Sequence, residues 1–122
     1  MKRILVVEDD AALREMIHDT LEVLGYEVDL AENGEQVLPR LAGNLPDLVL
    51  LDIQIPVFDG FSVLKRIRQT PQLAALKVVA LSAFAMRGDD QKALAAGFDA
   101  YLTKPIAIAD LRKKVQQMLN DS

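Results

Sequence analysis

Short, unbroken apolar runs alternate along this chain with longer segments whose apolar residues recur at helical spacing. The runs have the length of buried strands and lie at residues 4–7, 48–51 and 78–81. The segments with an apolar residue every three or four positions lie at 13–24, 61–67 and 108–118. This alternation is typical of parallel strands joined by crossover helices, so the sequence predicts an α/β fold. The unbroken apolarity of 48–51 indicates a central strand covered on both faces.

The remaining segments complete five strand-helix units. A more polar stretch near residues 26–31 predicts an edge strand. After it a helix is expected as far as Leu41, but Pro39 removes a backbone donor there and predicts a kink or a shortened helix. A small helix over 89–96 and a last strand over 100–103 follow further along the chain.

Size and composition narrow the class of protein. With 122 residues, 51% of them hydrophobic, the chain predicts one compact domain. Fourteen Lys and Arg against eighteen Asp and Glu give a net charge of −4, and without a basic run this argues against direct nucleic-acid binding. The lack of cysteine excludes disulfides and Cys-ligated metals. No apolar run suits a signal peptide or a membrane span of roughly 20 residues, so we expect a soluble cytoplasmic protein without membrane insertion.

Polar and charged residues stand at the carboxyl ends of the predicted strands. They are, in chain order, Glu8, Asp9, Asp10, Asp52, Ser82 and Lys104. In an open parallel sheet these ends share one edge, where ligands bind. Carboxylates that converge there resist being ionised together, and oxygen ligands that leave room for water and a phosphate suit Mg²⁺. The sequence therefore predicts a metal-assisted phosphoryl site with Asp52 as the nucleophile.

Each of these residues also has an ordinary structural explanation. Asp10 precedes a helix and is expected to cap its first turn. Ser82 by itself is typical of a turn, and Lys104 by itself is typical of a solvated lysine. Asp9 is different, because further acids at one strand end exceed what capping needs and cost stability unless a metal compensates them. The combination carries the functional prediction.

The order and spacing of these residues resemble a family signature. The residues that carry the resemblance are Glu8-Asp9, Asp52, Ser82-Ala83 and Lys104-Pro105. They are similar to the signature of the receiver domain of bacterial response regulators. The resemblance spans residues 1–122 and implies a single CheY-like, flavodoxin-like domain: a doubly wound five-stranded parallel sheet in the order 2-1-3-4-5 with five helices. The segments after Asp52 and Ala83 are most similar to stand-alone receivers of the cell-differentiation type and to receivers of hybrid sensor kinases.

The resemblance implies the chemistry of the site. Asp52 would be the phosphoacceptor, attacking the phosphorus of a phosphohistidine to form an acyl phosphate. Mg²⁺ would be held by Asp9, Asp52, the backbone carbonyl of Gln54 and, through water, Glu8. The ammonium of Lys104 would offset charge on the phosphoryl oxygens. The chain would then catalyse only its own phosphorylation and slow dephosphorylation, and would not be an enzyme with an external product.

The resemblance also implies a switch and its partners. The phosphoryl group would engage the Ser82 hydroxyl and draw in the loop that carries Ala83 and Phe84. Tyr101 is placed like the family's switch aromatic, which turns inward on activation, although an ordinary half-buried strand tyrosine also fits. Expected partners are a sensor histidine kinase or a histidine phosphotransfer protein as donor, and a downstream protein target. The target would bind the surface of the fourth helix, fifth strand and fifth helix.

Three other classes of protein fit the sequence less well. A phosphatase of the haloacid-dehalogenase type needs a second acid two residues after its nucleophile, where this chain has Gln54. A flavodoxin-like FMN carrier shares the fold, but the acids at 8–10 would repel its phosphate. A phosphorylation-independent scaffold would lack the acids or the lysine, and all are present. The sequence is compatible both with a stand-alone protein and with a fragment of a larger one. It does not specify the cognate kinase, the target or the lifetime of the phosphoryl group.

Overall fold

The strands in the described part of the chain pair into one parallel sheet, which confirms the predicted α/β fold. The computed structural model describes residues 1–55, 59–83 and 88–120. The strands are β1 (Arg3–Val7), β2 (Glu27–Ala31), β3 (Leu48–Asp52), β4 (Lys77–Ser82) and β5 (Ala100–Thr103). They lie in the order β2-β1-β3-β4-β5, so the more polar second strand is at an edge and β3 is central, both as predicted.

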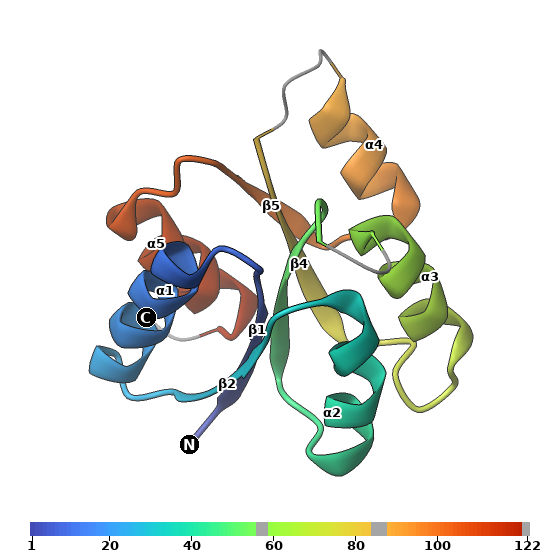
Figure 1. Ribbon diagram of the computed structural model, residues 1–122, viewed down its shortest axis with the longest axis horizontal. Helices are drawn as coiled ribbons and strands as arrows, with labels where there is room; N and C mark the ends of the chain where they lie inside the picture. Colours follow the sequence, from blue (N-terminus) through green and yellow to red (C-terminus); the bar gives the residue numbers. More distant parts are fainter. Residues whose placement is uncertain (56–58, 84–87, 121–122) are drawn as a thin grey trace.

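Helices cover both faces of the sheet, giving the doubly wound arrangement. In the described residues they are α1 (Ala11–Val23), α2 (Val37–Gly43), α3 (Gly60–Gln69), α4 (Asp89–Ala96) and α5 (Ile108–Met118). Helices α1 and α5 lie on one face, and α2, α3 and α4 lie on the other (Figure 1). Within this described part of the chain, no helix has both the length and the apolar character needed to span a membrane.

The core is divided between the two faces of the sheet. Side chains alternate along a strand, so Ile4 and Val6 pack toward α1 and α5, while Leu5 and Val7 pack toward the other helices. Every residue of β3 is buried, which is expected of a central strand with helices on both sides. Burying one such aliphatic side chain stabilises the fold by about 1.5–3 kcal/mol.

Local sequence signals set where the helices begin and end. The Asp10 carboxylate accepts hydrogen bonds from the amides of Ala12 at 3.0 Å and Leu13 at 3.3 Å, which confirms the predicted helix cap. Such a cap is worth about 1 kcal/mol. Helices α1 and α4 are each followed by a glycine in the left-handed region, Gly25 at φ +94° and Gly97 at φ +113°.

Pro39 coincides with a shortened second helix, one of the two outcomes expected. Helix α2 has seven residues and follows a single 3₁₀ turn, Gly34–Gln36. Pro39 is the third residue of α2, within the first turn, where a backbone amide has no intrahelical acceptor. The proline is therefore tolerated there.

Candidate functional site

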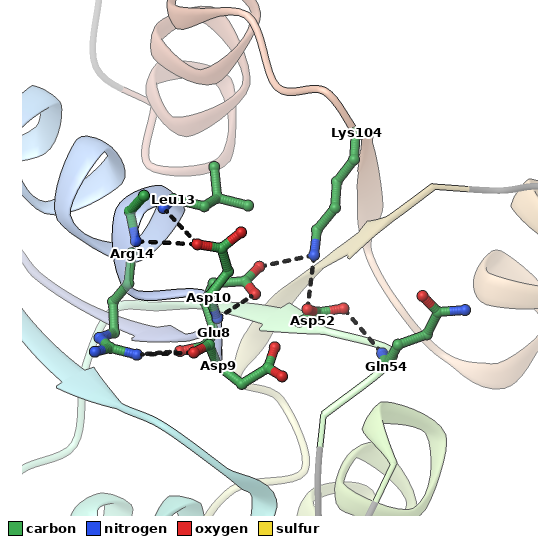
Figure 2. A network of polar contacts seen from close by, with 9 residues as sticks. Glu8, Asp9, Asp10, Leu13, Arg14, Asp52, Gln54 and Lys104 are labelled. Atoms are coloured by element: carbon green, nitrogen blue, oxygen red, sulfur yellow. Dashed lines mark hydrogen bonds and ion pairs between the residues drawn. The ribbon is translucent and has the colours of Figure 1, made fainter.

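The residues singled out in the sequence come together at the carboxyl edge of the sheet. Strand register aligns Val7 with Leu51, and Asp52, the last residue of β3, with Leu81. The loop after β1 carries the acids at 8–10 and therefore lies beside Asp52. Lys104 directly follows β5, and its side chain reaches back across the edge to these acids (Figure 2).

Asp52 is a buried carboxylate with a separate partner on each oxygen. Its side chain is 1% exposed. Oδ1 accepts a hydrogen bond from the backbone amide of Gln54 at 2.8 Å, and Oδ2 accepts one from Lys104 Nζ at 2.7 Å. These contacts fix the orientation of the Asp52 carboxylate at the carboxyl edge of the sheet (Figure 2).

Glu8 is fully buried beside Asp52. Its Oε2 accepts a hydrogen bond from the amide of Asp10 at 3.1 Å. Lys104 Nζ lies 2.9 Å from Oε1 and forms an ion pair with it. Burial raises the pKa of Glu8 to about 7; Lys104 and the Asp10 amide lower it, and Asp52 raises it further.

Lys104 is the cation that bridges the two buried carboxylates. Partial burial by itself would lower the pKa of its ammonium, but the hydrogen bond to Asp52 and the neighbouring Glu8 outweigh burial and raise the pKa. The lysine is therefore charged at neutral pH. The structure thus turns a residue that would ordinarily be solvated into the counterion of a buried acid pair.

Three carboxylates offer a set of oxygens that suits a hard divalent cation. One ligand atom each from Glu8, Asp9 and Asp52 lies within 4.8 Å of the others, with Asp9 exposed and the other two buried. The Gln54 amide adjoins the set through its bond to Asp52. Carboxylate oxygens are the ligands that Mg²⁺ prefers, and the exposed Asp9 leaves one side of the set open to water. The residues present therefore fit Mg²⁺.

The two predicted switch residues lie on the neighbouring strands β4 and β5. Ser82 is buried at the end of β4, and its carbonyl accepts a hydrogen bond from the Lys104 amide at 2.8 Å. Tyr101 on β5 is half-buried, and its hydroxyl lies 3.5 Å from Asp90 Oδ2 on α4. Phe84, on the loop expected to move, lies outside the described residues.

Two further residues, Gly60 and Arg14, hold the backbone of the site, and the sequence indicates such a role only for Gly60, as a residue of the loop geometry. Gly60, at the start of α3, approaches the backbone of Asp52 so closely that a Cβ there would lie 2.7 Å from the Asp52 carbonyl oxygen. Arg14 donates from Nη1 to the backbone carbonyl of Glu8 at 2.9 Å. An arginine on a helix surface is common, so Arg14 does not stand out before the fold is known.

Comparison with known proteins identifies the family of this chain. A family model described as the response regulator receiver domain matches residues 4–116. The chain belongs to the response regulator receiver family. Receivers are regulatory phosphoacceptors of two-component signalling and interact with histidine kinases and downstream targets. The resemblance recognised in the sequence is therefore confirmed, together with its CheY-like fold.

Individual receivers match this chain over nearly its whole length. The polar-differentiation response regulator DivK of Brucella anthropi is 33% identical over 99% of this chain and 98% of its own. The structure of the chemotaxis response regulator CheY4 of Vibrio cholerae superposes with a TM-score of 0.90 at 29% identity, covering 97% of this chain and 98% of that one. The receiver of a sensor histidine kinase from Pseudomonas aeruginosa has a TM-score of 0.89, 33% identity and 98% coverage of both chains, with a magnesium ion coordinated in its active-site cleft.

Proposed function

We propose that residues 1–122 form a receiver domain that accepts a phosphoryl group on Asp52 in a Mg²⁺-dependent reaction. The donor is a phosphohistidine of a sensor kinase or a histidine phosphotransfer protein. The observation that carries the proposal is the contact between Lys104 and two buried acids, one of which is Asp52 at the centre of the carboxyl edge. A structural ion pair would not need the exposed third acid, Asp9, beside it.

Asp52 is the carboxylate best placed to act as the nucleophile. It ends the central strand, so the loops after β1, β4 and β5 surround it. Its orientation is held by the Gln54 amide at 2.8 Å and by Lys104 at 2.7 Å. A fixed nucleophile lowers the entropic cost of an in-line attack on phosphorus.

The transfer exchanges one phosphorus bond for another. An Asp52 oxygen forms the new bond to phosphorus while the bond from phosphorus to the donor's imidazole nitrogen breaks, and the imidazole keeps the electron pair. The product is an acyl phosphate, which water later hydrolyses to regenerate the carboxylate. Bound Mg²⁺ supplies charge neutralisation at the phosphoryl oxygens. In our proposal Asp9, Asp52, the Gln54 carbonyl and, through water, Glu8 hold the ion.

Lys104 stabilises the charge that spreads over the phosphoryl oxygens. An ammonium has three donors, and its bond to Asp52 uses one of them. The side chain can therefore bond a phosphoryl oxygen without leaving the acid pair. Because its pKa is raised, the lysine carries its charge throughout the neutral range.

The acyl phosphate changes the partner-binding surface through Ser82 and Tyr101. The added group carries a charge of about −1.5 to −2 and three acceptor oxygens, one of which the Ser82 hydroxyl bonds. Tyr101 then leaves its position 3.5 Å from Asp90 and turns inward. This is a population shift between two packings, driven by the better phosphate contacts of one of them. The downstream target binds the surface formed by α4, β5 and α5.

Acetyl phosphate, a small phosphodonor, tests the proposal without the cognate kinase. Incubation with Mg²⁺ followed by intact-mass measurement is expected to show one labile phosphoryl group on the wild type. The same mixture with EDTA in place of Mg²⁺ is expected to show none. An unmodified wild-type protein would overturn the proposal and favour a phosphorylation-independent scaffold.

Two substitutions locate the modified residue. Asp52→Asn keeps the size of the side chain and removes the nucleophile, so no mass gain is expected. Asp59→Asn is the matched control, because Asp59 is an exposed acid that caps α3 by accepting a bond from the Ser62 amide. This control is expected to be modified as the wild type is. A mass gain in Asp52→Asn would show that another residue accepts the group.

A further inference from the structure

Arg14 anchors the loop that carries two of the acids of the site. It lies in the first turn of α1, and its side chain is 17% exposed. From Nη1 it donates to the Glu8 carbonyl at 2.9 Å and to the Asp9 carbonyl at 3.4 Å. Its Nη2 lies 3.8 Å from Glu32 Oε1, just beyond β2. Figure 2 shows the guanidinium folded back beneath the loop, on the side away from Lys104.

The contacts of Arg14 restrict the directions in which the Glu8 and Asp9 side chains project. Fixing two successive carbonyls fixes two successive peptide planes, and with them the bonds from which the Glu8 and Asp9 side chains project. The Glu8 amide is held as well, since it donates to the Ala31 carbonyl at 3.1 Å. The backbone of Glu8 is thus bound on both sides, whereas the Asp9 side chain is exposed and projects into the site from the loop that Arg14 holds.

We propose that Arg14 is a positioning residue for the metal site, acting through the backbone carbonyls of Glu8 and Asp9. This inference rests on the proposed function, because it assumes that these acids bind Mg²⁺. Residues that orient metal ligands typically contribute a factor of about 10–100 in metal affinity. Arg14 would do so without touching the ion or the phosphoryl group.

The charge of Arg14 and its hydrogen bonds have opposite effects on the affinity of the site for Mg²⁺. A guanidinium beside the site repels a cation, so removal of its charge by itself would tighten Mg²⁺ binding. Loss of the anchored loop geometry would weaken binding. Lysine keeps the charge but lacks the planar fork of donors that reaches two carbonyls. Arg14→Lys and Arg14→Gln therefore separate positioning from electrostatics.

The test is a calorimetric Mg²⁺ titration of the wild type, Arg14→Lys, Arg14→Gln and a matched control, Arg68→Lys. Arg68 also donates to backbone carbonyls, of Leu76 at 2.6 Å and Gly97 at 2.8 Å, but it lies at the other end of α3, away from the acids. We expect the Mg²⁺ dissociation constant to rise about tenfold in both Arg14 variants and to stay within twofold of the wild type in Arg68→Lys.

A second measurement distinguishes weaker Mg²⁺ binding from a slower phosphoryl transfer step. The maximal rate of modification by acetyl phosphate in Arg14→Lys is expected to return to the wild-type value at saturating Mg²⁺. Circular dichroism checks that each variant is folded. If Arg14→Gln does not fold, the Mg²⁺ affinity of Arg14→Lys tests the inference.

Each result of the titration has a distinct meaning. Wild-type dissociation constants in both Arg14 variants, tighter binding in Arg14→Gln, or wild-type affinity in Arg14→Lys would overturn the inference about Arg14. The same loss of affinity in Arg68→Lys would do so as well, since it would trace the effect to general destabilisation. A wild type that binds no Mg²⁺ would instead overturn the proposed function.

Discussion

At the scale of single residues, one lysine compensates two buried carboxylates. Lys104 Nζ lies 2.7 Å from Asp52 Oδ2 and 2.9 Å from Glu8 Oε1. Burial away from water is the main reason why the pKa of Glu8 is raised to about 7; Lys104 opposes this shift, and the neighbouring Asp52 adds to it. The buried acid pair is therefore a source of instability, and the proposed Mg²⁺ would relieve it by binding the folded state.

The raised pKa of Glu8 predicts how stability depends on pH. Folded Glu8 releases its proton near pH 7, but the unfolded chain releases it near 4.5. Between these values the folded state binds more protons, so the free energy of unfolding falls as pH rises. The fall is at most about 3.5 kcal/mol, at roughly 1.4 kcal/mol per pKa unit. Urea unfolding in EDTA from pH 5 to 8 measures it.

Two variants assign that pH dependence to Glu8. Glu8→Gln mimics the protonated acid and is expected to lose the fall in stability. Glu15→Gln changes an exposed glutamate of α1 and is expected to keep it. A slope in Glu8→Gln equal to that of the wild type would show that another group titrates in this range.

At the scale of elements, the start of α3 lies against the backbone of the site. A Cβ on Gly60 would lie 2.6 Å from the Ile53 Cα and 2.7 Å from the Asp52 carbonyl oxygen. The Gly60 amide donates to the Ile53 carbonyl at 2.7 Å, so helix and loop are held together. Only glycine permits this approach, and the position of Asp52 depends on it.

Gly60→Ala is expected to lower the free energy of unfolding by about 1–3 kcal/mol, because both clashing atoms belong to backbone that has to shift. Gly43→Ala is the control, since a Cβ at Gly43, the last residue of α2, meets nothing within 4 Å. This control is expected to be neutral or slightly stabilising. Urea midpoints measure both, and equal values for the two variants would contradict the account of Gly60.

At the scale of the whole molecule, features that depend on neighbouring residues could be predicted from the sequence. The apolar run before Asp52 marked the central strand, and Asp10 was recognisable as a cap. The meeting of Lys104 with the acids followed from their places at strand ends. The burial of Glu8 and the anchoring of its loop by Arg14 could not be predicted, because they depend on the packing of the whole fold around these residues and no local pattern encodes them.

In the proposed switch, a phosphoryl group on Asp52 changes the surface formed by α4, β5 and α5. Beryllofluoride with Mg²⁺ mimics that group, and amide chemical shifts report its binding and its effect together. We predict saturable shifts at Gln54 and Ser82 and, in the same titration, at Tyr101 and along α4 and α5. Asp52→Asn is expected to show none of them. A wild type that shows no shifts would contradict phosphorylation at Asp52. Shifts confined to the loop at residues 8–10 would contradict the switch.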